Sequence, residues 1–530
     1  PEPPGPGPLK RGLPGEAWAV RETITGPAPT DLVRDLVALT LDGEVRRLDA
    51  LGASHHFMTA PRVSPGGTRA AWIGWEHPHM PWDETELCVA DVLADGTFGP
   101  HRVVAGGAGV SVCQVQWESD EADESLVALS DPDGWWNLHR VGLDGTVDCL
   151  LRVDAEIGGP LWMLGARWFA PLGPGRPGRF AVLRNRRLAV LDAQAGTLTD
   201  LAGDLPVWGT AITARDGRIA GVASGPKSTP AVVSLDLDGD RQTLSVPTGE
   251  LPPAQYLPEP EERWFSGKGG GIPAFVYPPT NPDFAGPEAK LPPYVVHVHG
   301  GPTGGVSPVA DLQLAYLTSR GIGVVAVNYG GSAGYGRAFR ERLRGQWGVV
   351  DVDDCERVAL ALADEGVADR ERLGIRGGSA GGYTSALSAV TRQTYAAATI
   401  LFPVIDLLAF AEGGTHDFES QYDAGLVGAL PADRQRFVDR SPITHTSSLA
   451  CPVLLLQGLQ DEVCPPTQAE AFVAAIRGNG IRHAYVPFEG EQHGFRRAET
   501  IIAALESELS FYGQVFGFEP PGVPVLRLDT

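Results

Sequence analysis

Hydrophobic and polar positions follow different patterns in the two halves of the chain. Between about residues 31 and 246, short apolar segments are separated by turn-forming Asp-Gly pairs. Short strands bounded by such turns are typical of antiparallel sheets. From about residue 274 onward, apolar segments such as 294–299 (YVVHVH) and 323–328 (GVVAVN) alternate with segments long enough for helices. Strands that are apolar throughout and separated by helices predict a parallel sheet covered on both faces.

The first half also repeats itself. Segments of roughly 40–50 residues, each able to supply four strands, recur along it, which is the period expected of propeller blades. Four such segments follow a partial one, DLVALTLDGEVRRL. A β-sandwich would show fewer repeats. We therefore predict a β-propeller over residues 1–255 and a doubly wound, mostly parallel sheet over residues 256–530.

A glycine-rich turn follows the short apolar strand at 373–375. It reads Gly-Gly-Ser-Ala-Gly over residues 377–381, and the segment behind it can form a helix. This pattern fits the G-x-S-x-G nucleophile elbow, in which small neighbours leave the serine, here Ser379, exposed on a sharp strand-to-helix turn. A Gly/Ser-rich loop can match the same pattern by chance. The residues that could assist Ser379 therefore decide its interpretation.

A general base and its orienting carboxylate follow Ser379 in the chain. Asp461 comes directly after the strand-like segment 453–457, and His493 comes after the next one, 484–487. The order Ser, Asp, His is that of α/β-hydrolases, in which acid and base lie on loops at the carboxyl ends of strands. We predict that His493 exchanges a proton with Ser379 and that Asp461 orients the imidazole.

An oxyanion hole requires two backbone N–H donors. The N–H of Ala380, directly after the serine, is one candidate. The segment His299-Gly300-Gly301 follows the strand YVVHV and resembles the loop that supplies the second donor in such hydrolases. We expect His299 itself to be a buried, hydrogen-bonded residue that shapes this loop.

Composition narrows the choice of partners and compartment. The chain has 42 basic and 65 acidic residues, a formal net charge of −23 and a pI near 4.9, which argues against nucleic-acid or anionic-membrane partners. No apolar run approaches the roughly 20 residues that span a bilayer. The six cysteines are scattered without metal-ligand spacing, so we expect reduced thiols, a cytoplasmic location and neither metal nor cofactor. A homo-oligomer is left open.

Several stretches together resemble the prolyl oligopeptidase family of serine peptidases, in its acylaminoacyl-peptidase and dipeptidyl-aminopeptidase-like branch. They are HVHGGPTGG, VNYGGSAGYGRAFRERLRGQWGVVDVDDC, IRGGSAGGYT, SPITH, CPVLLLQGLQDEVCPPTQAE and FEGEQHGFR. The resemblance implies a β-propeller capping an α/β-hydrolase domain, with the active site in the cavity between them. Propellers of this family have seven blades, so the first half predicts a propeller that is short or incomplete at its N-terminus.

The resemblance also implies a pocket for the residue before the scissile bond. Its position in the family points to Tyr383, Phe410 and Val463. Plain core packing is the alternative for each of them, and for Tyr383 the two interpretations are equally balanced.

The function that these observations favour is a serine peptidase acting on short peptides through an acyl-enzyme on Ser379. A carboxylesterase would use the same triad, and a propeller scaffold with an inactive hydrolase half is a further alternative. Release of one residue or a dipeptide from unblocked peptides requires carboxylates that bind the α-ammonium group. The candidates are Asp83, Glu84 and Glu86 in the first half and Glu412 and Glu419 in the second.

Overall fold

The chain forms two compact units. The computed structural model describes residues 15–530 apart from residues 50, 119–123, 248, 250 and 414. Unit 1 contains the described residues of 1–225, 229–248 and 334–338, and unit 2 contains those of 226–228, 249–333 and 339–530. We describe each unit by itself.

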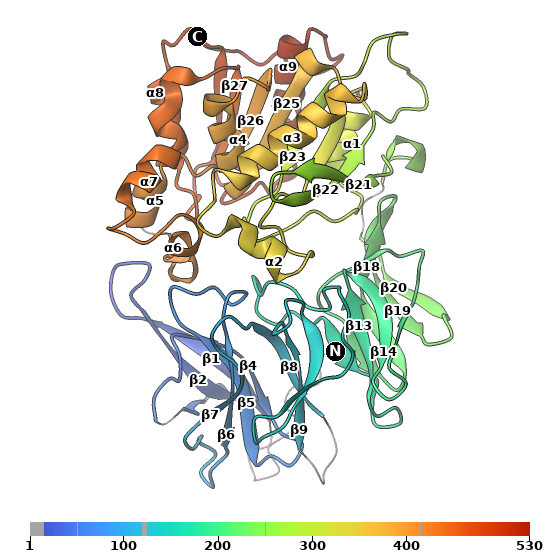
Figure 1. The fold of residues 1–530 in the computed structure, drawn as a ribbon, viewed down its shortest axis with the longest axis vertical. Helices are drawn as coiled ribbons and strands as arrows, with labels where there is room; N and C mark the ends of the chain where they lie inside the picture. The colour runs from blue at the N-terminus through green and yellow to red at the C-terminus, as the bar shows by residue number, and fades with distance from the viewer. Residues whose placement is uncertain (1–14, 50, 119–123, 248, 250, 414) are drawn as a thin grey trace. The chain divides into compact units, whose positions relative to one another are not determined.

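The described residues of unit 1 form five separate sheets, each made of strands that follow one another in the chain (Figure 1). The first sheet has three strands, the next three have four each, and the last has five. The strands are β1 (Glu16–Ile24), β2 (Leu32–Thr40), β3 (Val45–Arg47), β4 (Phe57–Val63), β5 (Arg69–Trp75), β6 (Glu86–Asp91), β7 (Arg102–Gly106), β8 (Val112–Glu118), β9 (Ser125–Ser130), β10 (Asn137–Val141), β11 (Val147–Cys149), β12 (Phe169–Pro171), β13 (Arg179–Arg184), β14 (Arg187–Asp192), β15 (Thr197–Asp200), β16 (Val207–Trp208), β17 (Thr213–Arg215), β18 (Arg218–Gly225), β19 (Ser228–Asp236) and β20 (Arg241–Ser245). One partial and four larger sheets are the arrangement that the repeats predict.

The sheets of unit 1 bury apolar residues against one another. Trp72 of β5 lies stacked on Phe98 with ring centroids 5.5 Å apart, and Trp18 of β1 meets Phe98 edge-on at 5.1 Å. These rings belong to one buried cluster, whose residues come from the first two sheets and the segments next to them. Because a single sheet cannot cover its own apolar faces, neighbouring sheets supply the core. The β-propeller prediction is therefore confirmed.

Unit 2 contains one eight-stranded sheet. Its strand order is β21-β22-β24-β23-β25-β26-β27-β28. Strands β23 to β28 run parallel, whereas at one edge β22 pairs antiparallel with both β24 and β21. The strands are β21 (Glu261–Gly267), β22 (Gly270–Tyr277), β23 (Tyr294–Val298), β24 (Gly323–Val327), β25 (Leu373–Gly378), β26 (Ala397–Leu401), β27 (Val453–Gly458) and β28 (His483–Phe488). The sheet confirms the predicted α/β-hydrolase fold.

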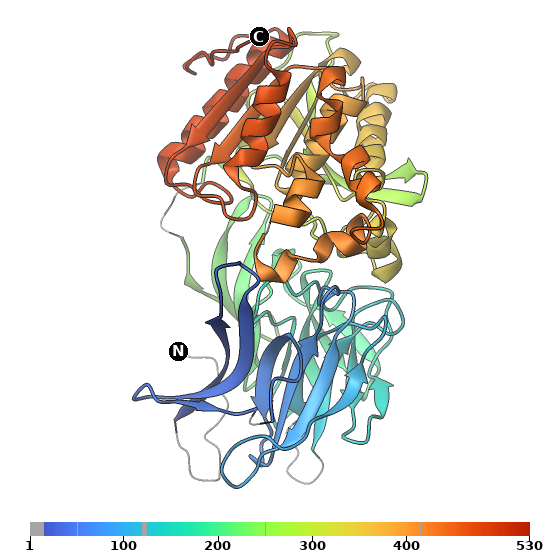
Figure 2. The same cartoon turned by 90° about the vertical axis from the view of Figure 1, so that its left-hand side faces the viewer.

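Helices cover both faces of this sheet. The helices are α1 (Leu312–Thr318), α2 (Arg337–Arg340), α3 (Val350–Asp364), α4 (Ala380–Thr391), α5 (Leu407–Gly413), α6 (Tyr422–Leu426), α7 (Arg434–Arg440), α8 (Pro466–Ile476) and α9 (Ala498–Phe516), with short 3-10 turns η1 (Ala254–Tyr256), η2 (Glu341–Leu343), η3 (Arg370–Arg372), η4 (Asp417–Glu419) and η5 (Pro442–Ser448). Figure 2 shows α9, in red, and α3, in gold, on opposite sides of the sheet. The central strands are consequently buried along their whole length, as β24 and β27 are.

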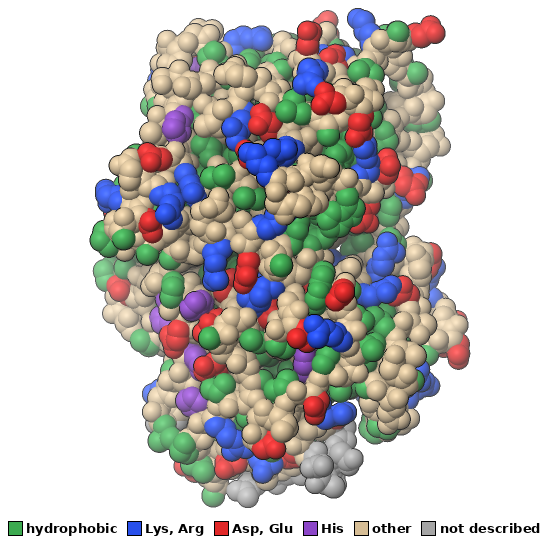
Figure 3. All heavy atoms as spheres, viewed as in Figure 1, with side chains coloured by type: hydrophobic (Ala, Val, Ile, Leu, Met, Phe, Trp, Pro, Cys, Tyr) green, Lys and Arg blue, Asp and Glu red, His purple; other side chains and the backbone are tan. Residues whose placement is uncertain are grey.

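Two further features of the described residues bear on the partners. No helix among them is both long and apolar enough to cross a bilayer. Acidic and basic side chains are interspersed on the face drawn in Figure 3, where neither sign gathers into a broad patch.

Candidate active site

The turn between β25 and α4 holds Ser379 in a strained backbone conformation. Ser379 has φ 58° and ψ −123°, which is unusual for a residue with a side chain. The turn is tight enough that a Cβ on Gly377 would lie 2.4 Å from the carbonyl oxygen of Gly381, and one on Gly381 would lie 2.2 Å from that of Val298. The small residues of the motif are therefore required by close backbone approach, and Ser379 stands partly exposed ahead of the helix.

Asp461 and His493 lie on the loops that follow β27 and β28. Nδ1 of His493 is 2.8 Å from Oδ2 of Asp461, whose side chain is fully buried. The other oxygen of Asp461 accepts hydrogen bonds from the backbone N–H groups of Val463 (2.9 Å) and Cys464 (2.8 Å). These donors hold the carboxylate in one orientation, and the carboxylate in turn orients the imidazole.

The ring of His493 is also positioned by its neighbours. It meets Phe402 edge-on at 4.9 Å, and Phe402 packs edge-on against Phe495 at 5.5 Å. Glu491, two residues before the histidine, accepts hydrogen bonds from the backbone N–H groups of Arg496 and Arg497, each at 3.0 Å. Glu491 thus attaches the loop of His493 to the segment that leads into α9.

The loop after β23 passes directly beside the serine. A Cβ on Gly300 would lie 3.4 Å from Cβ of Ser379 and 4.0 Å from its Oγ. Gly301 has φ +124°, and a side chain there would meet the backbone nitrogens of Thr303 and Gly304 at 2.9 and 3.0 Å. The loop can approach the nucleophile this closely because both positions are glycine. The backbone of this loop therefore passes beside Ser379, and Ala380 follows Ser379 directly, so the two segments predicted to supply oxyanion donors are neighbours of the serine.

His299 supports the loop after β23 through hydrogen bonds and ring stacking. Its Nε2 lies 2.7 Å from Oγ of Ser332 and its Nδ1 lies 2.8 Å from the carbonyl oxygen of Gly300. Tyr329 stacks on the imidazole at 4.4 Å. Burial lowers the pKa of His299 to about 4, so the ring is neutral near pH 7 and serves as a hydrogen-bonded support.

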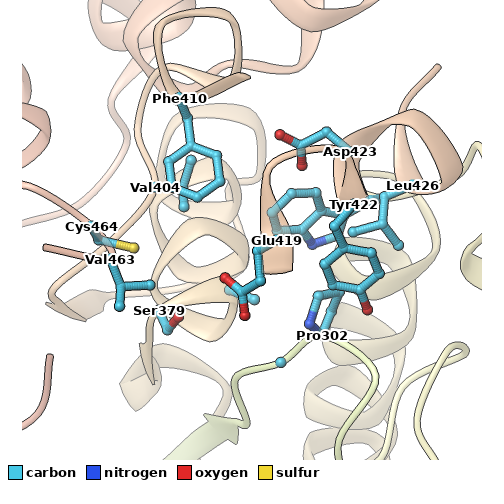
Figure 4. Close-up of a pocket in the computed structure, with 13 residues that line it drawn as sticks. Pro302, Ser379, Val404, Phe410, Glu419, Tyr422, Asp423, Leu426, Val463 and Cys464 are labelled. Atoms are coloured by element: carbon cyan, nitrogen blue, oxygen red, sulfur yellow. The ribbon is translucent and has the colours of Figure 1, made fainter. Parts of the chain in front are cut away.

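A pocket opens next to Ser379 within unit 2 (Figure 4). Its apolar walls come from the segment that follows β26, from the 345–347 loop and from the acid loop. The lining residues are Gly301, Pro302, Trp347, Ser379, Ala380, Val404, Phe410, Glu419, Tyr422, Asp423, Leu426, Val463 and Cys464. The candidate nucleophile, an oxyanion-loop residue and an apolar cavity with two carboxylates therefore share one space.

Known proteins share the fold of this chain over most of its length. A model of the prolyl oligopeptidase family matches residues 308–519. A crystal structure of a puromycin hydrolase is 49% identical with a TM-score of 0.93, covering 97% of this chain and 79% of that one. The structure of a Mycobacterium tuberculosis puromycin-hydrolyzing peptidase is 46% identical with a TM-score of 0.92, covering 98% of this chain and 80% of that one.

The chain belongs to the prolyl oligopeptidase family. This confirms the family predicted from its motifs. Among curated sequences, an acylamino-acid-releasing enzyme of Arabidopsis thaliana is 32% identical over 221 residues, which are 40% of this chain and 28% of that protein. The matched regions span less than half the length of the curated relatives, from 28% to 46%.

Within this family member, the predicted pocket residues lie in two different places. Phe410 and Val463 line the pocket. Tyr383 does not; it is fully buried in α4, where its hydroxyl donates to the carbonyl oxygen of Arg440 at 3.0 Å. Its ring packs on Trp347 at 4.4 Å, and Trp347 does line the pocket. Tyr383 therefore supports the pocket wall from behind.

Sequence reasoning did not find three of the polar or aromatic lining residues, namely Trp347, Tyr422 and Asp423. Trp347 lies within a family-like stretch but was not singled out there, whereas Tyr422 and Asp423 lie outside the motifs. Only Glu419 among the acidic candidates of the second half reaches the pocket. The segment around η4 and α6 follows β26, as segments lining an α/β active site often do. The position of Tyr422 and Asp423 after β26 was therefore the feature of the sequence that could have identified them.

Among the described residues of unit 1, one group offers three metal-ligand atoms close together. It consists of His55, Glu86 and Cys88. Nε2 of His55 lies 3.0 Å from Oε2 of Glu86, and burial raises the pKa of the Cys88 thiol to about 12. A protonated thiol beside an already hydrogen-bonded pair is a poor ligand set. We therefore interpret this group as structural.

Proposed function

We propose that this protein is a serine peptidase that removes the amino-terminal residue from short peptides and related amides through an acyl-enzyme on Ser379. The observation that carries the proposal is the strained, partly exposed serine at the carboxyl edge of the sheet, with the Asp461–His493 pair on the adjacent loops. Ser, Asp and His in this chain order, on this fold, are the components of acyl-transfer catalysis.

Each group has a defined step in the proposed mechanism. His493 takes the proton from Oγ of Ser379 as the oxygen attacks the scissile carbonyl carbon. The N–H groups of Ala380 and of the Gly300–Gly301 loop donate to the oxyanion that forms. The intermediate collapses when His493 passes its proton to the leaving amine. Water then attacks the acyl-enzyme by the same route and releases the acid.

The substrate class follows from the pocket and from the relatives. Two similar solved structures carry names that refer to puromycin hydrolysis. Puromycin is an aminoacyl amide with a free α-amino group and an aromatic side chain. The rings of Trp347 and Phe410, with Val404 and Leu426, offer the apolar surface that such a side chain would contact. We therefore propose an aromatic or large aliphatic residue before the scissile bond.

The proposal is tested with matched chromogenic substrates. We expect phenylalanine p-nitroanilide to be hydrolysed with a higher kcat/KM than N-acetylphenylalanine p-nitroanilide, and puromycin to be cleaved at its amide bond. A preference for the acetylated substrate would point to acylaminoacyl-peptidase activity and contradict the proposal. Hydrolysis of p-nitrophenyl esters without hydrolysis of any anilide would point to a carboxylesterase. Absence of turnover with every substrate would point to a propeller scaffold with an inactive hydrolase half.

Location and further partners stay proposals as well. We propose a cytoplasmic protein that acts on short peptides without nucleic-acid or membrane partners. The buried thiols of Cys88, Cys113, Cys355, Cys451 and Cys464 are consistent with a reducing compartment. Cell fractionation tests the location, and sedimentation analysis tests whether the protein is a homo-oligomer.

A further inference from the structure

Two carboxylates line the pocket next to the candidate nucleophile. Glu419 ends the η4 turn, and Asp423 lies one turn into the following segment, on α6. In Figure 4 the carboxylate of Glu419 points into the space between Ser379 and Tyr422, and Asp423 lies farther into the pocket, on the side of Phe410 and Leu426. Neither residue has a step in the proposed acyl transfer.

These charges lack a matching cation in the pocket. Among its lining residues in the described part of the chain there is no Lys, Arg or His. The side chain of Asp423, with the residue only 6% exposed, has no hydrogen bond or ion pair to any described residue. Nε2 of His416, which is half exposed, lies 3.5 Å from Oε2 of Glu419 and offsets its charge only when that imidazole is protonated. A buried carboxylate without a partner is costly, so Asp423, beside a second carboxylate, indicates a ligand that supplies positive charge.

The wall that carries them is held rigidly. The hydroxyl of Tyr422 is 2.5 Å from Oγ1 of Thr303 and accepts the backbone N–H of Thr303 at 3.2 Å, which ties α6 to the oxyanion loop. The backbone N–H of Trp347 donates to the carbonyl oxygen of Leu426 at 3.2 Å. A rigid wall keeps the carboxylates at a constant place relative to Ser379, as positioning of a substrate requires.

We propose that Glu419 binds the α-ammonium group of the substrate's first residue, with Asp423 as a second acceptor deeper in the pocket. This inference rests on the proposed function, because it assigns a substrate group to the same site. In this arrangement the side chain of that residue enters the apolar part of the pocket and its carbonyl carbon faces Ser379.

The geometry favours the α-ammonium group over a lysine side chain. The α-nitrogen lies only about 2.5 Å from the carbonyl carbon that Ser379 attacks, because two bonds separate them. A carboxylate that faces the space beside the nucleophile, as Glu419 does, therefore meets the α-ammonium group. The terminal ammonium of a lysine would lie farther along the pocket, among the apolar rings.

The charge of the pair also suits one ammonium group. Burial, and after it the charge of Glu419, raises the pKa of Asp423 to about 7. Near neutral pH Asp423 is therefore partly protonated and adds less than one full negative charge to the pocket. A single ammonium group compensates Glu419 by a charge-assisted hydrogen bond.

The test compares free and blocked substrates in three variants. Glu419→Gln keeps the shape of the side chain and removes its charge, and Asp423→Asn does the same at the second carboxylate. Glu412→Gln is the matched control, because Glu412 lies in the same half, is about half exposed and pairs with Arg434 at the surface. The substrates are the p-nitroanilides of phenylalanine, N-acetylphenylalanine and N-acetyllysine.

We expect Glu419→Gln to lower kcat/KM for phenylalanine p-nitroanilide by roughly 10- to 100-fold, the usual effect of losing a hydrogen bond to a charged group. Hydrolysis of the N-acetylphenylalanine substrate should be unchanged or faster, and Asp423→Asn should have a smaller effect in the same direction. Equal losses on both phenylalanine substrates would overturn the proposal. So would a selective loss on the N-acetyllysine substrate, which would assign Glu419 to a side-chain cation.

A binding measurement separates this inference from the proposed function. Calorimetry of Ser379→Ala with phenylalaninamide and N-acetylphenylalaninamide requires no turnover. Glu419→Gln in that background should weaken binding of the free amine alone. Unchanged affinity in a protein whose wild type is active would refute the role of Glu419 and leave the peptidase proposal standing. If the wild-type protein turned over no substrate but the selective effect on binding remained, the peptidase proposal would be refuted and the ammonium site would stand.

Discussion

Ser379, Asp461 and His493 are each held by neighbours that leave them little freedom. Glycines on both sides of Ser379 permit its strained backbone, and two backbone N–H groups hold one oxygen of Asp461. Cys464 lies next to this group. Burial, and after it the charges of Asp461 and Glu419, raise the pKa of its thiol well above the ordinary range. The thiol therefore stays protonated, and Ser379 is the better candidate nucleophile of the two.

At the residue scale we predict that Asp461→Asn lowers kcat by about 10⁴-fold, because the amide would favour the wrong imidazole tautomer. The double variant with His493→Ala should be hardly worse than the poorer single variant, because the residues act as a unit. Steady-state kinetics on phenylalanine p-nitroanilide, with circular dichroism as a folding control, provides the measurement. Near wild-type activity in Asp461→Asn would reassign the acid, with the neighbouring Glu462 as the next candidate.

At the scale of elements, the loop between β28 and α9 depends on Glu491. Burial opposes ionisation of this carboxyl, but the backbone N–H groups of Arg496 and Arg497 outweigh it and lower the pKa of Glu491 to about 2. The residue is only 2% exposed, so these bonds are sheltered from water. The carboxylate thus keeps the loop of His493 against the start of the last helix.

A lowered pKa has a definite consequence for stability. The ionised form is favoured in the folded state, so the contribution of Glu491 is complete above its ordinary pKa of 4.5 and is lost as the pH falls towards about 2. We predict that Glu491→Gln is less stable than wild type at pH 7 and that the difference shrinks below pH 4.5. Urea unfolding at several pH values measures it. Glu499→Gln, which changes an exposed carboxylate on α9, is the control and should show no such change.

At the scale of the whole molecule, a buried ion pair ties the central strand of unit 2 to the last helix. Nε of Arg376 on β25 lies 2.8 Å from Oε1 of Glu508 on α9, and both side chains are almost fully buried. The guanidinium also reaches Nδ1 of His297 at 2.9 Å, and the hydroxyl of Tyr512 donates to Glu508 at 3.0 Å. Segments 132 positions apart in the chain are joined here.

Removing one partner of this pair should destabilise the protein strongly, because the other charge remains buried. We predict that Arg376→Met lowers the free energy of unfolding by about 3–5 kcal/mol. Arg370→Met, which removes an exposed pair with Asp364, should change it by less than about 1 kcal/mol. Chemical denaturation compares the two. Similar small losses in both variants would show that the buried pair contributes little to stability.

The sequence predicts those features of the fold and the site that neighbouring residues in the chain determine. The nucleophile elbow can be predicted because close backbone approach requires glycine at its positions. Asp461 and His493 can be predicted because each directly follows an apolar strand. The apolar pattern predicts that the second sheet begins near residue 274, but the sheet begins earlier, at β21, whose mostly exposed residues give no apolar pattern. The boundary at residues 255 and 256 remains a prediction about domains.

The sequence predicted the lining of the pocket less completely than the candidate triad. Tyr383 directly follows the elbow, yet the packing of α4 turns its ring towards Trp347 and away from the cavity. Asp423 belongs to no motif, and it reaches the pocket only because the path of residues 407–426 brings α6 to the 345–347 loop. Such contacts depend on tertiary packing, which local patterns do not encode.

The central claim is that Ser379 is the nucleophile, and covalent labelling tests it most directly. The protein is treated with a fluorophosphonate, digested, and mapped by mass spectrometry. We predict one adduct per chain on Ser379, no adduct in Ser379→Ala, and much slower labelling in His493→Ala because the general base is missing. Undiminished labelling of Ser379→Ala, or an adduct on another residue of the wild type, would contradict the account.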